Sequence, residues 1–340
     1  MTFLADPFPP PATGHAGHHG HGAATTPPPG SRTVGEIAGW HELAAWRPSP
    51  GWLVLVVVLA GGYLVAVAVL RRRGVRWPLG RSAAWLGGVV TLAAMTCTGV
   101  GQLGAALFSV HMGQHMVLSM LTPILLLLGA PITLALRVLP AIGRAGGPRR
   151  LLLKVLQSRV AKVVSHPGVT VPLFVTSLFG LYFTQLLDLA MGSHVGHQLM
   201  LIHFLMVGLL FFGPILAVDP WPRRSAPGLR LLEMLTAVPF HAFFGVIVMG
   251  AGYPLSDTFA ASARALGVDP LADQATGGGI AWGFGETPIL IVTLAVFVQW
   301  VRTDSRAARR FDRQAARDGD AELAAYNARL RLLNDRQPAS

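Results

Sequence analysis

The chain has 340 residues, of which 52% are hydrophobic and 13% are charged. In a typical soluble domain about a quarter of the residues are charged. This composition therefore excludes an ordinary soluble domain as well as a disordered chain. The formal net charge of +11 would suit a nucleic-acid-binding protein, but the positions of the basic residues indicate a membrane protein with no nucleic-acid partner.

Residues 1–50 are rich in proline, glycine and histidine and offer few groups that pack, so we predict that this tail is disordered. It lacks the basic start and apolar core of a cleavable signal peptide, and we expect it to be translocated with the first span. Four histidines lie close together in the sequence GHAGHHGHG: His15, His18, His19 and His21. Such a tract can collect copper, zinc or nickel loosely, and a low-complexity tail without a role is the alternative.

Apolar runs of about 20 residues, long enough to cross a bilayer, recur along the rest of the chain. We place seven: Trp52–Leu70, Ala84–Leu107, Gly113–Leu136, Val169–Leu189, His197–Val218, Leu231–Gly250 and Ile280–Val301. The sequence therefore predicts an all-α, seven-helix transmembrane domain over residues 51–302. An Arg-rich, helix-prone tail follows over residues 303–340.

The basic residues alternate between the predicted loops. The first, third and fifth loops carry five, seven and three Lys and Arg residues and the tail carries nine, whereas the second and fourth loops carry none. The positive-inside rule therefore places the N-terminus outside and the C-terminus in the cytoplasm. We expect the membrane to be the plasma membrane. Anionic lipid headgroups are the expected counter-charge. The third loop, residues 140–168, is predicted to form a basic amphipathic helix on the inner membrane surface.

The motif HMGQHM begins the third apolar run, on the predicted outer side. His111 and His115 are four residues apart, as are Met112 and Met116, so a helix stacks each pair on one face. Imidazole and thioether groups suit Cu(I), and ionisable side chains are rare in membrane helices that have no use for them. The motif therefore predicts copper binding at the outer membrane face.

Further histidines follow in the fifth and sixth spans. His197 opens the fifth span, and the helical rise places His203 roughly 10 Å below the outer boundary. His241 follows Pro239 in the sixth span, roughly 13 Å below the same boundary. These positions predict a second, deeper tier of ligands. A hydrogen bond to a neighbouring helix is the alternative for a single histidine, and core packing is the alternative for the methionines.

The sequence contains no motif that indicates another kind of chemistry. The sequence has no phosphate-binding Gly loop, no HExxH, no Ser-nucleophile motif and no CxxCH haem-attachment signature. Acidic residues near the predicted outer face are too few for a hard-cation site. Cys97 is the single cysteine, which excludes an internal disulfide.

The stretch from Gly74 through Pro140 resembles the CtaG-type cytochrome c oxidase assembly factors. The resemblance rests on Arg76-Trp77-Pro78, Arg81, HMGQHM and LLLLGAPITLALRVLP, then HQLMLIHFLMVGLLFFGPILAVDP from His197, then His241, Asp273-Gln274, Gly277-Gly278 and Trp282. The chain departs from the family pattern at Phe211-Phe212-Gly213, where tryptophans are expected, and at Thr122 before Pro123. The resemblance implies a seven-span protein that matures haem-copper oxidases by helping copper reach them. It also implies that His111, Met112, His115, Met116 and His197 are the positions to test first.

Together these features predict a membrane metallochaperone of the respiratory chain, not an enzyme, because ligand exchange involves no covalent chemistry. Cu(I) would come from the His tract or from an extracytoplasmic donor. His111, His115 and His197 would hold it with Met112 or Met116. It would then pass to an oxidase subunit, directly or by way of His203 and His241.

Two alternatives stay open at this stage. A bis-His haem protein would use His203 and His241, which share a predicted depth. A transporter for copper or protons would need polar groups through the cytoplasmic half, where only Glu233 and Asp219 lie near the boundary.

Overall fold

The structure, a computed structural model, describes residues 34–37, 39–140, 146–223, 225–319 and 321–334. Over these residues the regular structure is helical and no strand forms, which confirms the all-α prediction. The tract of His15, His18, His19 and His21 lies outside the described residues.

The helices follow one another along the chain with short connections. They are α1 (Val34–Ile37), α2 (Trp40–Ala44), α3 (Pro50–Arg72), α4 (Leu79–Thr96), α5 (Gly99–Leu103), α6 (Phe108–Met116), the π-helical turn η1 (Val117–Leu121), α7 (Thr122–Leu128), α8 (Pro131–Val138), α9 (Gly147–Gln157), α10 (Arg159–Val164), α11 (Pro167–Tyr182), α12 (Leu186–Met191), α13 (His194–Leu216), α14 (Pro227–Gly250), α15 (Asp257–Ala265), α16 (Pro270–Asp318) and α17 (Ala321–Asn334).

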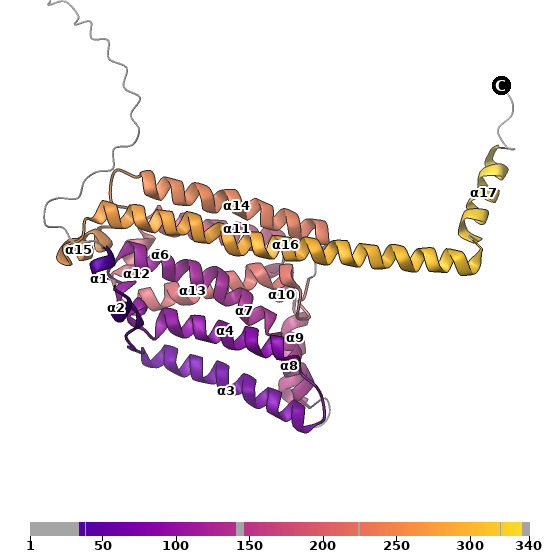
Figure 1. Cartoon of the computed structure of the whole chain (residues 1–340), viewed down its shortest axis with the longest axis horizontal. Coiled ribbons are helices and arrows are strands. Elements are labelled where there is room, and N and C mark those ends of the chain that lie inside the picture. The colour runs from indigo at the N-terminus through magenta and orange to yellow at the C-terminus, as the bar shows by residue number, and fades with distance from the viewer. Residues whose placement is uncertain (1–33, 38, 141–145, 224, 320, 335–340) are drawn as a thin grey trace, which may run out of the picture.

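Five of the predicted spans appear as segments long and apolar enough to cross a membrane. They are α3, the run Phe108–Val138 from α6 to α8, α13, α14 and α16. Figure 1 shows these helices side by side in one bundle, with α3 at one edge and α14 at the other. The protein is therefore built as a multi-pass membrane protein.

The second and fourth predicted spans are shorter than expected. Ala84–Leu107 is broken after Thr96, because Thr98 is extended, forms a bridge with Trp46 and caps α5 by accepting from Val100 N at 3.3 Å. The predicted span Val169–Leu189 ends at Tyr182, and α12 follows as a separate helix. Neither α4 nor α11 is among the five spanning segments, although both lie in the bundle.

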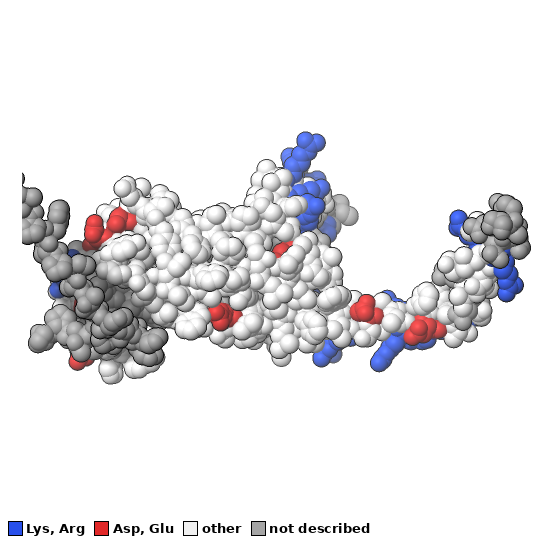
Figure 2. Space-filling model, turned by 90° about the horizontal axis from the view of Figure 1, so that it is seen from above, with Lys and Arg blue, Asp and Glu red and all other residues white. Residues whose placement is uncertain are grey.

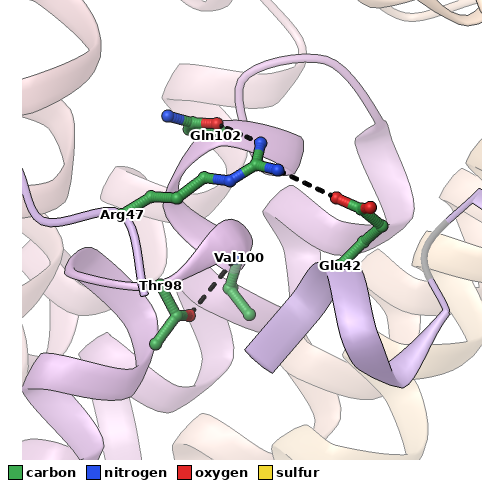
Figure 3. Close-up of polar contacts among 5 residues, drawn as sticks. All are labelled: Glu42, Arg47, Thr98, Val100 and Gln102. Atoms are coloured by element: carbon green, nitrogen blue, oxygen red, sulfur yellow. Dashed lines mark hydrogen bonds and ion pairs between the residues drawn. The ribbon is translucent and has the colours of Figure 1, made fainter. Parts of the chain in front are cut away.

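The segment 39–49, which we name the strap, is ordered, in contrast to the disorder that we predicted through residue 50. Gly99 N donates to Ala45 O at 2.8 Å and Arg47 N donates to Cys97 O at 2.9 Å. The Arg47 guanidinium also bonds Gln102 at 2.9 Å and Glu42 at 3.1 Å (Figure 3). The disorder prediction was based on amino-acid composition, and composition does not reveal backbone pairing of this kind.

The predicted amphipathic loop helix is two helices, α9 and α10. Ser158 separates them, and its hydroxyl accepts from Ala161 N at 3.0 Å. Exposed apolar side chains lie on this surface beside basic ones: Leu151, Val155, Val160 and Val163. Figure 2 shows most of the visible Lys and Arg residues gathered at one end of the bundle and on the arm beyond it.

The helix α16 crosses the boundary that we predicted between the membrane domain and the tail. It runs unbroken for 49 residues, and beyond Arg302 almost all of its residues are exposed. Figure 1 shows this part projecting from the bundle as an arm that ends in α17.

The contact that positions the candidate site joins α13 to the η1 turn. Pro123 has no N–H to donate to the Ser119 carbonyl, four residues earlier, and the chain forms a π-helical turn there. The freed carbonyl faces Gly208, where a side-chain Cβ would collide with Ser119 O and would lie 2.6 Å from Pro123 Cγ. Glycine at position 208 therefore lets α13 approach the third span backbone to backbone.

Candidate metal centre

The helix that carries HMGQHM is held at its start by a carboxylate from another helix. Asp273, on α16, accepts hydrogen bonds from Phe108 N at 2.7 Å, from Ser109 N at 3.1 Å and from the Ser109 hydroxyl. The residue at the N-cap position is Leu107, which has no side-chain acceptor. Asp273 thus supplies the missing cap, where a negative charge is favoured by the helix dipole.

His111 is fully buried at the outer end of the bundle. Its ring centre lies 6.0 Å from that of His197, and aromatic rings surround it: Tyr182 at 5.9 Å, Phe259 at 5.2 Å and Phe204 at 6.4 Å. Neither ring nitrogen makes a hydrogen bond of normal geometry, although the Gly104 backbone approaches the ring. Apart from this approach, both nitrogens of the buried imidazole lack a partner.

His197 lies in the first turn of α13, facing His111. Ser193 caps this helix by accepting from Gly196 N at 3.0 Å. His197 is only 4% exposed, and its Nε2 has no hydrogen-bond partner. Buried polar atoms are nearly always hydrogen-bonded, so three free nitrogens on two adjacent imidazoles require an explanation such as a bound ion or water.

His115, one turn after His111, is buried but partnered. Its Nδ1 is hydrogen-bonded to the Tyr182 hydroxyl at 2.9 Å. Its ring stacks on Phe204, with centres 3.6 Å apart and planes 8° apart. The hydroxyl engages one ring nitrogen and holds the ring in place, as outer-shell hydrogen bonds hold metal-binding histidines.

The two methionines of the motif are core residues. Met112 and Met116 are both 0% exposed and belong to the main hydrophobic core, as does Cys97. Their burial fits the packing alternative as well as a ligand role. Within the described part of the chain, no group of three or more His, Cys, Asp or Glu side chains has the arrangement of a metal site.

The deeper histidines lie apart from this pair. His203 is on the exposed surface of α13, and its Nε2 is 2.9 Å from the Ser177 hydroxyl. His241 is buried in α14 beside Phe174, at 5.1 Å between ring centres, and its Nδ1 is 3.4 Å from Ala237 O. Each ring has a partner of its own, as the hydrogen-bond alternative predicts, and no contact joins the two where the structure is described.

Sequence reasoning missed one polar side chain of the motif, Gln114. It is 0% exposed, its Nε2 donates to Met95 O at 2.6 Å, and its Oε1 has no partner. A Cβ added at Gly104 would lie 2.5 Å from that oxygen, so the glycine makes room for it. A buried amide one turn from His111, inside an apolar run, was the signal that could have identified it.

A second carboxylate supports the wall around His111. Asp188 accepts from the Ser256 hydroxyl at 2.6 Å and from Thr258 N at 3.1 Å, at the start of the helix that carries Phe259. Burial alone would raise the pKa of Asp188, but these hydrogen bonds outweigh it and lower the pKa below its ordinary value. The ionised form of Asp188 therefore stabilises this wall.

Comparison with known proteins identifies the family. Residues 61–303 match the family described as cytochrome c oxidase caa3 assembly factor. Uncharacterized proteins of Mycobacterium bovis and Mycobacterium tuberculosis are each 47% identical to the chain over 296 residues, which are 86% of this chain and 45% of theirs. One from Mycobacterium leprae is 45% identical over 282 residues, or 82% of this chain and 43% of its own length. The chain thus spans a little under half the length of these relatives, and no solved structure matches it. On this evidence the chain belongs to the cytochrome c oxidase caa3 assembly factor family.

Proposed function

We propose that the protein binds Cu(I) between His111 and His197 and delivers it to a copper centre of the oxidase. The supporting observation is the pair of buried imidazoles, 6.0 Å apart, with three nitrogens that lack hydrogen bonds. Leaving such an atom unsatisfied costs about 1–3 kcal/mol, and a metal ion removes that cost for the atoms that it binds. Imidazole nitrogen suits copper and zinc alike, and the thioethers of Met112 and Met116 on the same helix favour Cu(I).

Transfer would proceed by ligand exchange, in which the acceptor's ligand binds before one of the protein's ligands leaves. His115 shares Phe204 with His111 and is the next imidazole along the helix, so it is the candidate for a third ligand. Tyr182 would hold it in place through Nδ1. The step changes no covalent bond, so the role is that of a metallochaperone, not an enzyme. An extracytoplasmic copper donor would load the site.

The topology is part of this proposal. We infer that α4 and α11 complete a seven-span bundle in the plasma membrane, with the N-terminus outside and the C-terminus in the cytoplasm. The gathering of Lys and Arg at one end of the bundle supports this orientation (Figure 2). It puts the His111–His197 pair at the extracytoplasmic end, opposite the arm.

A Cu(I) competition titration on the detergent-purified chain tests the proposal. The four tail histidines are first replaced by alanine so that they do not contribute. We expect about one tightly bound Cu(I) per chain, lost in the double variant His111→Ala, His197→Ala. The matched control is His203→Ala, which removes an exposed histidine of the same helix as His197. Equal binding by the double variant and the control would refute the proposed site.

A further inference from the structure

The long helix α16 carries a single charged residue, Glu286, between Asp273 and Arg302. The helical rise places Glu286 about 20 Å from Asp273 and about 24 Å from Arg302. The hydrocarbon layer of a bilayer is about 30 Å thick. Any position of the helix that keeps both flanking charges out of this layer therefore leaves Glu286 inside it.

The side chain of Glu286 is not sheltered by the bundle. It is partly exposed, and its neighbours on the helix surface are exposed as well: Trp282, Gly283, Thr287 and Leu290. The flank between the charged ends of the molecule carries few charged residues, with a few acidic atoms at its surface (Figure 2). This side of α16 thus presents a carboxylate where the surroundings are lipid.

The carboxylate lacks the hydrogen bonds that this position demands. Trp282 Nε1 donates to Glu286 Oε1 at 3.0 Å, and within the described residues this is its one hydrogen bond. A carboxylate has two oxygens and accepts several donors, and lipid chains supply none. Intramembrane ionisable residues are accordingly found paired or facing a protein interior.

We propose that this surface, formed by Trp282, Gly283, Glu286, Thr287 and Leu290 and named the α16 face, packs against a transmembrane helix of another protein. That helix carries a basic or hydrogen-bond-donating side chain that reaches Glu286. Gly283 and Thr287 are small and four residues apart, a spacing that allows close helix approach. A Cβ added at Gly283 would meet nothing within 4 Å, so the space beside it is open to a partner.

Other occupants fit the α16 face less well. In a dimer of two copies related by a two-fold axis through this face, Glu286 would approach Glu286, and like charges repel. Lipid headgroups lie at the membrane surface, too far from Glu286 to pair with it. The remaining candidate is a helix of another protein. Naming an oxidase subunit as the source of that helix rests on the proposed function.

Site-specific photo-crosslinking tests the proposal. A photoreactive residue at Thr287 of the full chain, in cells that make the oxidase, is compared with one at Val58, which is 61% exposed on α3. We expect Thr287, but not Val58, to crosslink to a transmembrane peptide of an oxidase subunit that contains Lys, Arg, His or another donor side chain. Crosslinking only to lipid, or to a second copy of the chain, would overturn the proposal.

The charge of Glu286 is tested in the same assay. Glu286→Gln keeps the size of the side chain and removes its charge, and we expect the crosslink yield from Thr287 to fall several-fold. Leu294→Ala, on the same exposed side of α16, is the control and should leave the yield unchanged. An unchanged yield in Glu286→Gln would refute the role of the carboxylate.

Cu(I) titration of Glu286→Gln separates this proposal from the proposed function. The variant should bind copper as the unmodified chain does, because Glu286 is not among the groups around His111 and His197. In the chain that keeps Glu286, absence of the Thr287 crosslink with copper binding intact would overturn only the α16 face. A chain that crosslinks but binds no copper would overturn only the copper site.

Discussion

Asp273 and Ser109 lie 164 positions apart in sequence, yet the carboxylate of the first accepts both the backbone N–H, at 3.1 Å, and the hydroxyl of the second. The same device recurs at the other end of this span. Asp219 accepts from Ile132 N at 3.1 Å and from Thr133 N at 2.8 Å, at the start of α8. Distant carboxylates thus cap helices whose own sequences provide no cap, and they fix both ends of the span that carries HMGQHM.

Asp273→Asn tests the cap of α6. Asparagine retains one acceptor and introduces an amide donor that faces the donors of Phe108 and Ser109, so we expect a loss of about 1–3 kcal/mol of stability. The midpoint of thermal unfolding in detergent should fall by several degrees relative to the control Asp257→Asn, whose side chain is exposed. Equal midpoints would mean that the cap contributes nothing to stability.

Asp188 gives the stability a defined dependence on pH. Because the folded-state pKa lies below the ordinary value of 3.8, the stabilisation is fully present above pH 3.8 and is lost as the pH falls through the folded-state pKa. Asp188→Asn removes this dependence. Below pH 3.8 the unfolding midpoint of the unmodified chain should therefore drop more steeply than that of the variant, and parallel curves would contradict the assignment.

Gly208→Ala tests the contact that brings α13 to the third span. The added Cβ collides with the Ser119 carbonyl, so the helices must separate, at a cost of about 1–3 kcal/mol. Because His197 is on α13, we also expect weaker Cu(I) binding. Gly180→Ala in α11 is the matched control, since a Cβ there meets nothing within 4 Å. Tight copper binding by Gly208→Ala would show that His197 does not depend on this contact.

Tyr182→Phe removes only the hydroxyl that holds His115. If His115 joins the copper site, loss of an outer-shell partner should weaken Cu(I) binding about 10–100-fold. Tyr63→Phe is the control at the other end of the bundle, where Tyr63 donates to Gly129 O at 2.8 Å. Tyr63 also accepts from Trp77 Nε1 at 3.0 Å, so both variants lose buried hydrogen bonds, but only Tyr182→Phe should change the copper affinity. Equal affinities would remove His115 from the site.

Hydropathy predicted where most of the long helices lie, because the length of an apolar run is a local property. It did not predict the break after Thr96, since that break depends on a bridge from Trp46, about 50 residues earlier. For the same reason composition predicted disorder for the strap, whose order comes from hydrogen bonds to the α4–α5 connection.

The site was predicted in part. Spacing put His111 and His115 on one side of a helix, and the structure places them so. That His197 lies against His111 depends on the order of helices in the bundle and on the contact of Gly208 with Ser119, which spacing does not reveal. The depth estimate grouped His203 with His241, but depth along a helix says nothing of direction around it. His203 points outward, and His241 points into the core.

The length of α16 has a mechanical consequence. At 49 residues it is about 74 Å long, more than twice the thickness of the hydrocarbon layer. Pro288 lies within it and does not end it. One continuous helix therefore joins the exposed arm at one end of the bundle to Asp273 at the other. A force that tilts the arm is therefore transmitted along α16 to Asp273. Asp273 is hydrogen-bonded to the first turn of the helix that carries His111.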